Sequence, residues 1–250
     1  MNKVKWMSTI ALVLLLFFAF SSVASAEAIE LPGIPTSDDP ADVGNTVSIL
    51  ILLTLLSLAP AIVILMTSFT RIVIVLGFVR TALATNQMPP NQVLIGLALF
   101  MTLFVMSPTI ADVNERALQP YLDGQLTQQE ALSEAVIPMK EFMGKHTREK
   151  DLLLFLNFAK AEKPTGYADI PLTTLVPAFA ISELKTAFQM GFMIFIPFLV
   201  IDMVVASVLM AMGMMMLPPV MISLPFKILL FILVDGWHLV VKSLLLSFGN

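Results

Sequence analysis

Long apolar stretches, broken only by prolines and single charges, constrain this chain more than any other feature of its sequence. Residues 43–70 contain no charged side chain, and residues 93–110 form a second uncharged stretch. A helix needs roughly 20 apolar residues to cross the bilayer hydrocarbon, with a range of about 17–25. Hydrophobic residues make up 58% of the 250 residues and charged residues only 13%, which is too little polar surface for a water-soluble globule. We therefore expect an all-α integral membrane protein.

The first 26 residues have the pattern of a secretory signal peptide. Two lysines precede an apolar run over residues 10–20, and Ala24-Ser25-Ala26 forms a small-x-small cleavage site. We predict that residues 1–26 are a signal peptide cleaved after Ala26; an uncleaved first membrane helix is the alternative. Residues 27–45 are acidic and rich in Pro, Gly and Ser, and they are predicted to form an exposed N-terminal tail.

The rest of the chain divides into two hydrophobic pairs around a polar insert. Residues 46–110 are assigned to a first pair of hydrophobic helices, in which Pro60 is expected to break or kink the chain because proline lacks the N–H of a helical turn. Residues 184–250 are assigned to a second pair. The sequence thus predicts four hydrophobic helical segments arranged as two hairpins.

The polar insert, residues 111–183, is predicted to be a small, largely helical domain. Thr127 and Glu130 occupy the two positions of a capping box and open one helix. Apolar residues at helical spacing predict another helix over residues 151–160.

Orientation follows from the arginines near the first short connection. Arg71 and Arg80 favour a cytoplasmic location for that connection, because short cytoplasmic loops carry an excess of Lys and Arg. The insert is then expected to be extracytoplasmic.

Single charges interrupt the apolar segments, among them Arg71 in the first pair and Asp202, Lys227, Asp235 and Lys242 in the second. Arg71, Asp202 and Asp235 are the candidate functional charges among them. A charge at the bilayer centre costs roughly 2.5–3.5 kcal/mol on insertion scales, so such groups usually face a bundle interior, a cavity or a partner. They are candidates for lining a polar path or for pairing across subunits. Snorkelling to the interface or a structural salt bridge is the alternative, and for Arg71, which is closer to a segment end, the alternative is favoured.

Methionines crowd the hairpin of the second pair, which turns at Gly213, Pro218 and Pro219. They are Met210, Met212, Met214, Met215, Met216 and Met221. Methionine is flexible and polarizable and conforms to varied partners. A ring of such side chains could seal a pore against ions and still deform around a passing polypeptide; apolar filling of the hairpin is the alternative.

Enzyme chemistry has little support in the sequence. Cysteine is absent, and the two histidines, His146 and His238, form no metal-binding motif. Neither a P-loop nor a nucleophile elbow is present. Basic blocks of the kind that bind nucleic acid are also missing. We expect no catalytic residues, no cofactor, no metal and no nucleic-acid partner.

One stretch carries a specific resemblance. Residues 176–192 contain Pro177, Ser182, Glu183, Leu184, Phe188 and Gly191 in the arrangement of the FliP family signature. Residues 196–202, 213–219, 224–227, 66–71 and 89–92 also match. The sequence is therefore similar to the export-gate proteins of the flagellar type III secretion system.

The resemblance implies a role that spacing alone does not. Proteins of this family form a pentameric ring, completed by FliQ and FliR, that acts with FlhB and FlhA in the bacterial cytoplasmic membrane at the flagellar basal body. Unfolded flagellar subunits pass through the ring. By resemblance, Met214, Met215 and Met216 form the channel gasket, and Asp202 is a buried charge.

The family also departs from four lipid-facing spans, since its hydrophobic segments pack into a cone-shaped complex raised largely above the bilayer. The alternative function is a secondary transporter of a small solute, suggested by broken helices and intramembrane charges.

Overall fold

The computed structural model describes residues 40–85, 87–160, 164–214 and 216–249, and all regular structure among them is helical. The predicted signal peptide and residues 27–39 of the predicted tail lie outside the described residues. The chain divides into two units, residues 1–58 and residues 59–250. In the first unit the described element is the greater part of the apolar helix α2 (Pro40–Met66).

Helix α2 continues through Pro60, so the predicted break at that residue is wrong, and a kink there stays a prediction. The chain breaks instead at Thr67 and Ser68, before α3 (Phe69–Leu83). The Thr70 hydroxyl donates to the Ile64 carbonyl at 2.6 Å. Hydroxyl side chains that bond nearby backbone offer the chain an alternative to continued helix, and this segment is rich in them.

The next apolar segment is longer than predicted. Helix α4 (Asn91–Val113) runs on through a π-helical stretch, η1 (Asn114–Leu118), into the short α5 (Gln119–Leu122). The continuous apolar helix therefore covers Asn91–Leu122, which is 32 residues, and its last turns lie in the predicted insert.

The helices of the insert begin where the sequence places them. Helix α6 (Gln128–His146) opens with the predicted capping box: the Glu130 N–H donates to Thr127 Oγ1 at 3.3 Å, and the Thr127 N–H donates to Glu130 Oε2 at 2.8 Å. Helix α7 (Glu149–Phe158) confirms the second predicted helix within two residues at each end. A 3₁₀ turn, η2 (Tyr167–Asp169), leads to the next helix.

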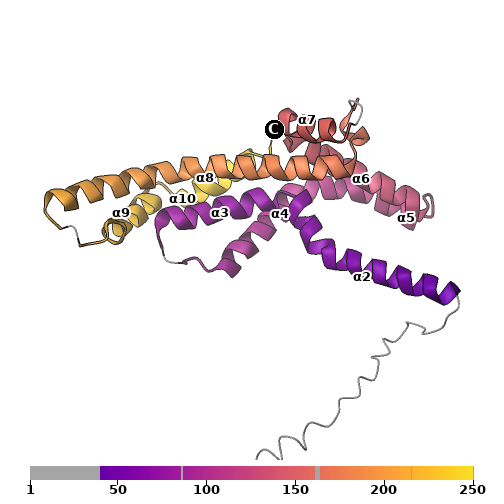
Figure 1. The fold of residues 1–250 in the computed structure, drawn as a ribbon, viewed down its shortest axis with the longest axis horizontal. Helices are drawn as coiled ribbons and strands as arrows, with labels where there is room; N and C mark the ends of the chain where they lie inside the picture. The colour runs from indigo at the N-terminus through magenta and orange to yellow at the C-terminus, as the bar shows by residue number, and fades with distance from the viewer. Residues whose placement is uncertain (1–39, 86, 161–163, 215, 250) are drawn as a thin grey trace, which may run out of the picture. The chain divides into compact units, whose positions relative to one another are not determined.

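Helix α8 (Leu172–Ala211) is the longest element, and its 40 residues span about 60 Å at 1.5 Å per residue. It crosses the predicted boundary between residues 183 and 184 without a break. It runs beside α3, with α7 packed near its first turns and α9 (Pro219–Leu233) near its last (Figure 1). Helix α10 (Gly236–Leu246) then follows α9 at a bend of 63°.

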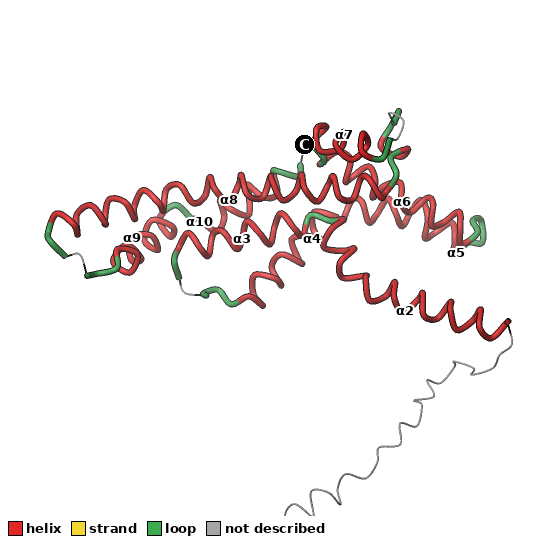
Figure 2. Tube along the Cα trace, in the orientation of Figure 1, coloured by secondary structure: helices red, strands yellow, loops and turns green. Residues whose placement is uncertain are grey.

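Two of the described helices, Asn91–Leu122 and Leu172–Ala211, are long and apolar enough to cross a membrane, and the bent pair α9 and α10 is a third candidate. The described residues between the helices are loops and turns (Figure 2). An all-α protein with apolar candidate spans is thus confirmed for the described residues. The arrangement in four segments and two hairpins stays a prediction.

The core of the second unit forms around α3. One face of α3 is fully buried at Ile72, Val75, Leu76 and Val79, where it meets α8, α4 and α9. A second cluster joins the insert to the start of α8. Its buried members are Met106, Phe142, Met143, Ile170, Leu175 and Phe179. Both clusters include Phe248 near the C-terminus as a packed neighbour, so this residue links the two.

Candidate functional site

The methionine hairpin joins α8 to α9. Gly213 adopts a φ of +73°, a left-handed conformation that glycine takes at little cost, and Pro219 opens α9 at the position where a helix tolerates proline. Met214 is exposed and Met216 is 98% exposed, whereas Met215 lies outside the described residues. The described hairpin methionines therefore leave their thioethers open to contact beyond this chain.

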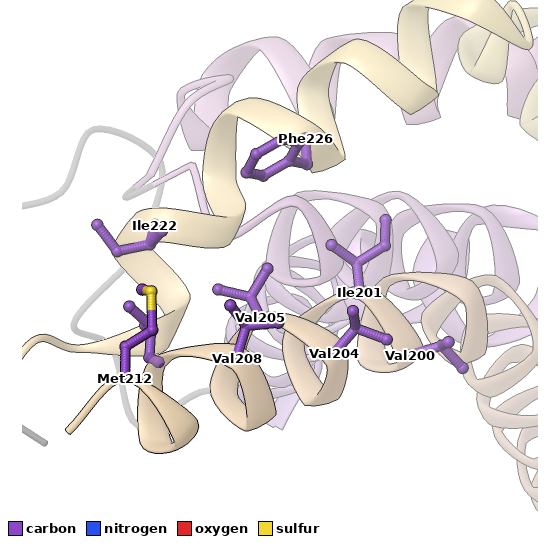
Figure 3. A pocket seen from close by; sticks show the side chains of 9 residues that line it. Val200, Ile201, Val204, Val205, Val208, Met212, Ile222 and Phe226 are labelled. Atoms are coloured by element: carbon purple, nitrogen blue, oxygen red, sulfur yellow. The ribbon is translucent and has the colours of Figure 1, made fainter. Parts of the chain in front are cut away.

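Behind the hairpin, α8 and α9 enclose an apolar groove of about 530 Å³. Figure 3 shows Ile201, Val205 and Met212 on α8 on the side facing Ile222 and Phe226 on α9. Its lining residues are Val200, Ile201, Val204, Val205, Val208, Leu209, Met212, Ile222 and Phe226. None of these side chains carries a hydrogen-bonding N or O atom, so the groove suits hydrocarbon surface and has nothing to orient a polar solute.

Asp202 ties α8 to α9. Its carboxylate accepts a hydrogen bond from Lys227 Nζ at 2.6 Å and another from the Ser223 hydroxyl. The Lys227 side chain is 2% exposed and that of Asp202 24% exposed. A buried ammonium of this kind needs a paired anion. Asp202 thus has a partner within its own chain, and a pairing of Asp202 across subunits stays a prediction.

Arg71 is buried at the junction of α3, α8 and the C-terminal segment. Its Nε donates to Glu183 Oε2 at 2.8 Å, and its Nη2 donates to the second carboxylate oxygen of Glu183. Its Nη1 donates to the carbonyl and hydroxyl oxygens of Ser247, each at 2.9 Å. The guanidinium carbon lies 3.9 Å from the centre of the Phe248 ring. Arg71 forms a structural salt bridge, the alternative favoured for it from the sequence.

Asp235 occupies the bend between α9 and α10. Its φ is +48°, an uncommon value for a residue with a side chain, and it precedes the first residue of α10. The Asp235 side chain is exposed, and it is not part of the buried pair of Asp202 and Lys227. The Asp235 N–H donates to the Ile232 carbonyl at 3.1 Å. Its position therefore marks a break in the fourth apolar segment.

Three residues of the matched signature stretch hold α8 against its neighbours. The Ser182 hydroxyl donates to Asp151 Oδ2 at 2.7 Å and accepts from the Arg148 N–H at 3.1 Å, which fixes the start of α7 on α8. On the α3 side, Phe188 meets Phe78 edge to face with ring centres 5.4 Å apart. A Cβ at Gly191 would lie 2.3 Å from the Phe78 ring, so only glycine allows this approach. Of the other three, Glu183 binds Arg71, Leu184 is exposed and Pro177 is half-buried within α8.

Comparison with known proteins now identifies the family. The sequence model of the FliP family matches residues 52–244. The chain belongs to the FliP family. A relative from Bacillus subtilis (strain 168) is 69% identical over 219 residues, which cover 88% of this chain and 99% of the relative. One from Cereibacter sphaeroides is 55% identical over 81% of this chain and 67% of the relative, and one from Aquifex aeolicus is 48% identical over 88% and 92%. All three are named "Flagellar biosynthetic protein FliP".

In this FliP family chain, the sequence did not predict the partners of Arg71 and Asp202, which are Glu183 and Lys227. Glu183 was a signature residue with no assigned partner, and Lys227 only marked an interruption of an apolar segment. The charge of each residue could have indicated a partner, because a charged side chain in or beside an apolar segment is usually paired. Phe248, which stacks on Arg71, carried no signal at all.

His146, which belongs to no metal-binding motif in the sequence, lies at the end of α6. Its Nδ1 lies 2.8 Å from the Phe142 carbonyl, and its ring lies 5.4 Å from that of Phe248. Burial lowers the pKa of His146, and the positive charge of Arg71 lowers it further, against the raising effect of the bond to Phe142. The imidazole is therefore neutral near neutral pH.

The start of α7 holds a well-bonded carboxylate. Partial burial tends to raise the pKa of Asp151, but the hydrogen bonds from Ser182 and Arg148 outweigh it and the net pKa is lowered. Within the described part of the chain, no group of three or more His, Asp or Glu side chains is placed to hold a metal ion.

Proposed function

We propose that this protein is a core component of the flagellar type III export gate in the bacterial cytoplasmic membrane. With sister copies it forms a channel through which unfolded flagellar subunits cross that membrane. The observation that carries the proposal is the 69% identity to a "Flagellar biosynthetic protein FliP" over 99% of that protein's length. The family match also favours export over the secondary transport of a small solute.

The assembly would be a pentameric ring of this chain, completed by FliQ and FliR and acting with FlhB and FlhA. The exposure of α8 supports this arrangement, because only 11% of its most apolar 18-residue window is buried within the chain. At about 60 Å, α8 is twice as long as the roughly 30 Å of bilayer hydrocarbon, so lipid alone does not cover it. A cleaved signal peptide over residues 1–26, the four-segment topology and an extracytoplasmic insert belong to the same proposal.

Met214, Met215 and Met216 would form the gasket at the centre of the ring. The exposure of Met214 and Met216 supports this role, because a seal must reach beyond the chain that carries it. Thioether side chains are apolar enough to exclude hydrated ions and flexible enough to fit around varied polypeptides. Export substrates would push the hairpins apart and the side chains would close again around them.

The charged residues would support this assembly. Asp202 keeps a quarter of its side chain exposed beside Lys227, which leaves an edge for a cation of a neighbouring copy. Arg71 would act within the chain by fixing α3 and α8, and Asp235 would set the bend of the fourth segment.

The gasket is tested by ion leakage through the assembled complex. The triple variant Met214→Ala, Met215→Ala and Met216→Ala should raise resting membrane conductance, because three small side chains leave the constriction open, while the complex still assembles. A control variant, Met88→Ala, replaces an exposed methionine outside both the hairpin and α8 and should leave conductance unchanged. Unchanged conductance in the hairpin variant would remove these residues from the seal.

A second measurement separates the gate from a transporter. The native mass of the detergent-extracted protein, expressed with its partner proteins, should correspond to a higher oligomer. A monomer or dimer with no small membrane partners would contradict the export-gate proposal.

A further inference from the structure

The residues that follow α10 are held by two separate parts of the chain. Arg71 of α3 donates two hydrogen bonds to Ser247, each at 2.9 Å, and its guanidinium carbon lies 3.9 Å from the centre of the Phe248 ring. From the insert, the Phe142 ring of α6 stacks on the Phe248 ring with ring centres 6.5 Å apart. We call Ser247 and Phe248 the latch, because they tie the end of α10 to both α3 and α6.

His146 adds a titratable group to this contact. Its ring centre lies 5.4 Å from that of Phe248 and 4.7 Å from that of Phe142, and its Nδ1 lies 2.8 Å from the Phe142 carbonyl oxygen. The imidazole and the Arg71 guanidinium therefore lie against the same phenylalanine ring. A proton added to His146 places a second positive charge near Arg71, in partly buried surroundings where charges are poorly screened.

The closed latch suits the neutral form of His146 better than the charged form. The charged groups around the ring come from four helices: Arg71 on α3, Asp112 on α4, Glu141 and Lys145 on α6, and Glu183, which binds Arg71, on α8. Burial lowers the pKa of His146 most, and the charges of Arg71 and Lys145 lower it further. Backbone hydrogen bonds at Phe142 and Phe248 act in the opposite direction without reversing the result.

A cleft beside the latch gives the His146 ring a second position. It lies between α4 and α6 and has a volume of about 340 Å³. Its lining includes the latch residue Phe248, His146 itself and three charged residues, Asp112, Glu141 and Lys145. Two carboxylates against one ammonium make the cleft negative. An imidazolium that turns into the cleft leaves Arg71 and approaches these carboxylates, and both changes favour its charged form.

We propose that His146 is the proton-operated release of this latch: the protonated ring turns into the cleft, and the latch residues come away from α3 and α6. The step takes up one proton per chain and breaks no covalent bond. A proton stabilises whichever state binds it more tightly, so a falling pH shifts the equilibrium toward the open latch. Near neutral pH the uncharged imidazole keeps the latch closed.

The latch bears on the methionine hairpin because α9 and α10 form one packed pair. A Cβ at Gly236 would lie 2.2 Å from the Phe231 ring, so the two helices meet closely at their bend. The latch follows one end of this pair in the chain, and the hairpin precedes the other. Release of the latch therefore frees the far end of the helix pair that the hairpin begins. This control goes beyond the proposed gate and changes nothing in what passes through it.

Hydrogen exchange of the purified full-length protein tests the release, with each rate corrected for the pH dependence of exchange in an unstructured chain. The N–H groups of residues 247–249 bond to carbonyls in the last turn of α10, and they exchange when this end is untied. Their protection should fall by up to about tenfold between about pH 8 and about pH 5.5, because the lower value is one unit below the ordinary pKa of 6.5. The fully buried Ile72 and Val79 of α3 should keep their protection.

The two histidines of the chain supply matched variants. His146→Gln takes up no proton but keeps an N–H for the Phe142 carbonyl, so residues 247–249 should stay protected at every pH. His238→Gln removes the other histidine, which is exposed on α10, and should leave the pH response intact. His146→Lys carries a fixed charge and should lower the protection of residues 247–249 already at the higher pH.

Each outcome decides the inference. A response below about twofold in the unmodified protein overturns the release, and so does a full response in His146→Gln. Loss of protection that extends to α3 also overturns it, because the whole fold rather than the latch would then open. If His146→Lys does not fold, the comparison of His146→Gln with His238→Gln decides without it. The latch lies within one chain, so its failure leaves the export-gate proposal standing.

Discussion

The buried pair of Arg71 and Glu183 gives the sharpest prediction for stability. Glu183→Ala leaves the guanidinium with its two bonds to Ser247 and its contact with the Phe248 ring, but without a counter-charge. Both side chains are at most 4% exposed, so solvent screens the charge very little. Breaking a buried pair on one side typically costs about 3–5 kcal/mol, because an uncompensated charge stays buried.

The double variant Arg71→Met with Glu183→Leu has a different expected cost. It removes both charges and fills the space with apolar atoms of similar volume, which is often neutral or stabilising for a buried pair. Here it also loses the bonds from Arg71 to Ser247, so we expect a net destabilisation of about 1–2 kcal/mol, near the usual worth of one or two such bonds. The double variant should therefore be more stable than Glu183→Ala alone.

Thermal unfolding of the detergent-solubilised protein measures this difference. Trp237, whose ring lies 5.4 Å from that of Phe231, offers a fluorescence signal. For a chain of this size each kcal/mol corresponds to about 2–4 °C, so Glu183→Ala should lower Tm by about 6–20 °C and the double variant by about 2–8 °C. Equal shifts for the two variants, or a shift below 2 °C for Glu183→Ala, would refute the assignment of a buried charge pair.

Two further predictions concern the packing around α3 and the histidine at the end of α6. Gly191→Ala should cost about 1–3 kcal/mol because the new Cβ would meet the Phe78 ring, and most of that cost should vanish in a Phe78→Ala background, as a double-mutant cycle of melting temperatures would show. His146 resists protonation in the folded state, so the unfolded state binds more protons once the pH falls below the ordinary pKa of 6.5. Folding stability should then decrease as the pH drops below that value and be unaffected above it; His146→Phe should flatten this dependence, and an unflattened profile would exclude His146 as its source.

Local features of the fold were predictable from the sequence. The capping box of Thr127 and Glu130 opens α6 because both partners lie within one helical turn, where no distant contact is needed. The hairpin after α8 follows from Gly213 and the adjacent prolines, which end one helix and start the next. The resemblance of residues 176–192 to a family signature was also readable directly, and the family match confirms it.

Features that depend on distant residues were not predictable. Arg71 and Glu183 are 112 positions apart, and nothing in the spacing of the sequence connects them. The break before α3 lies at Thr67 and Ser68 because the helix there carries local hydroxyl bonds, whereas Pro60 is accommodated within α2. An apolar helix can continue through a proline when neighbouring groups bind the carbonyl that the proline leaves free. A single sequence does not reveal those neighbours.

The uninterrupted course of α8 joins the insert to the methionine hairpin through one rigid rod. Because α8 has no break, no loop intervenes between its first turns and the turn at Gly213. The two prolines within the rod, Pro177 and Pro197, are the places where it could flex. Stiffening these positions would test whether a displacement of the insert reaches the methionine hairpin through α8.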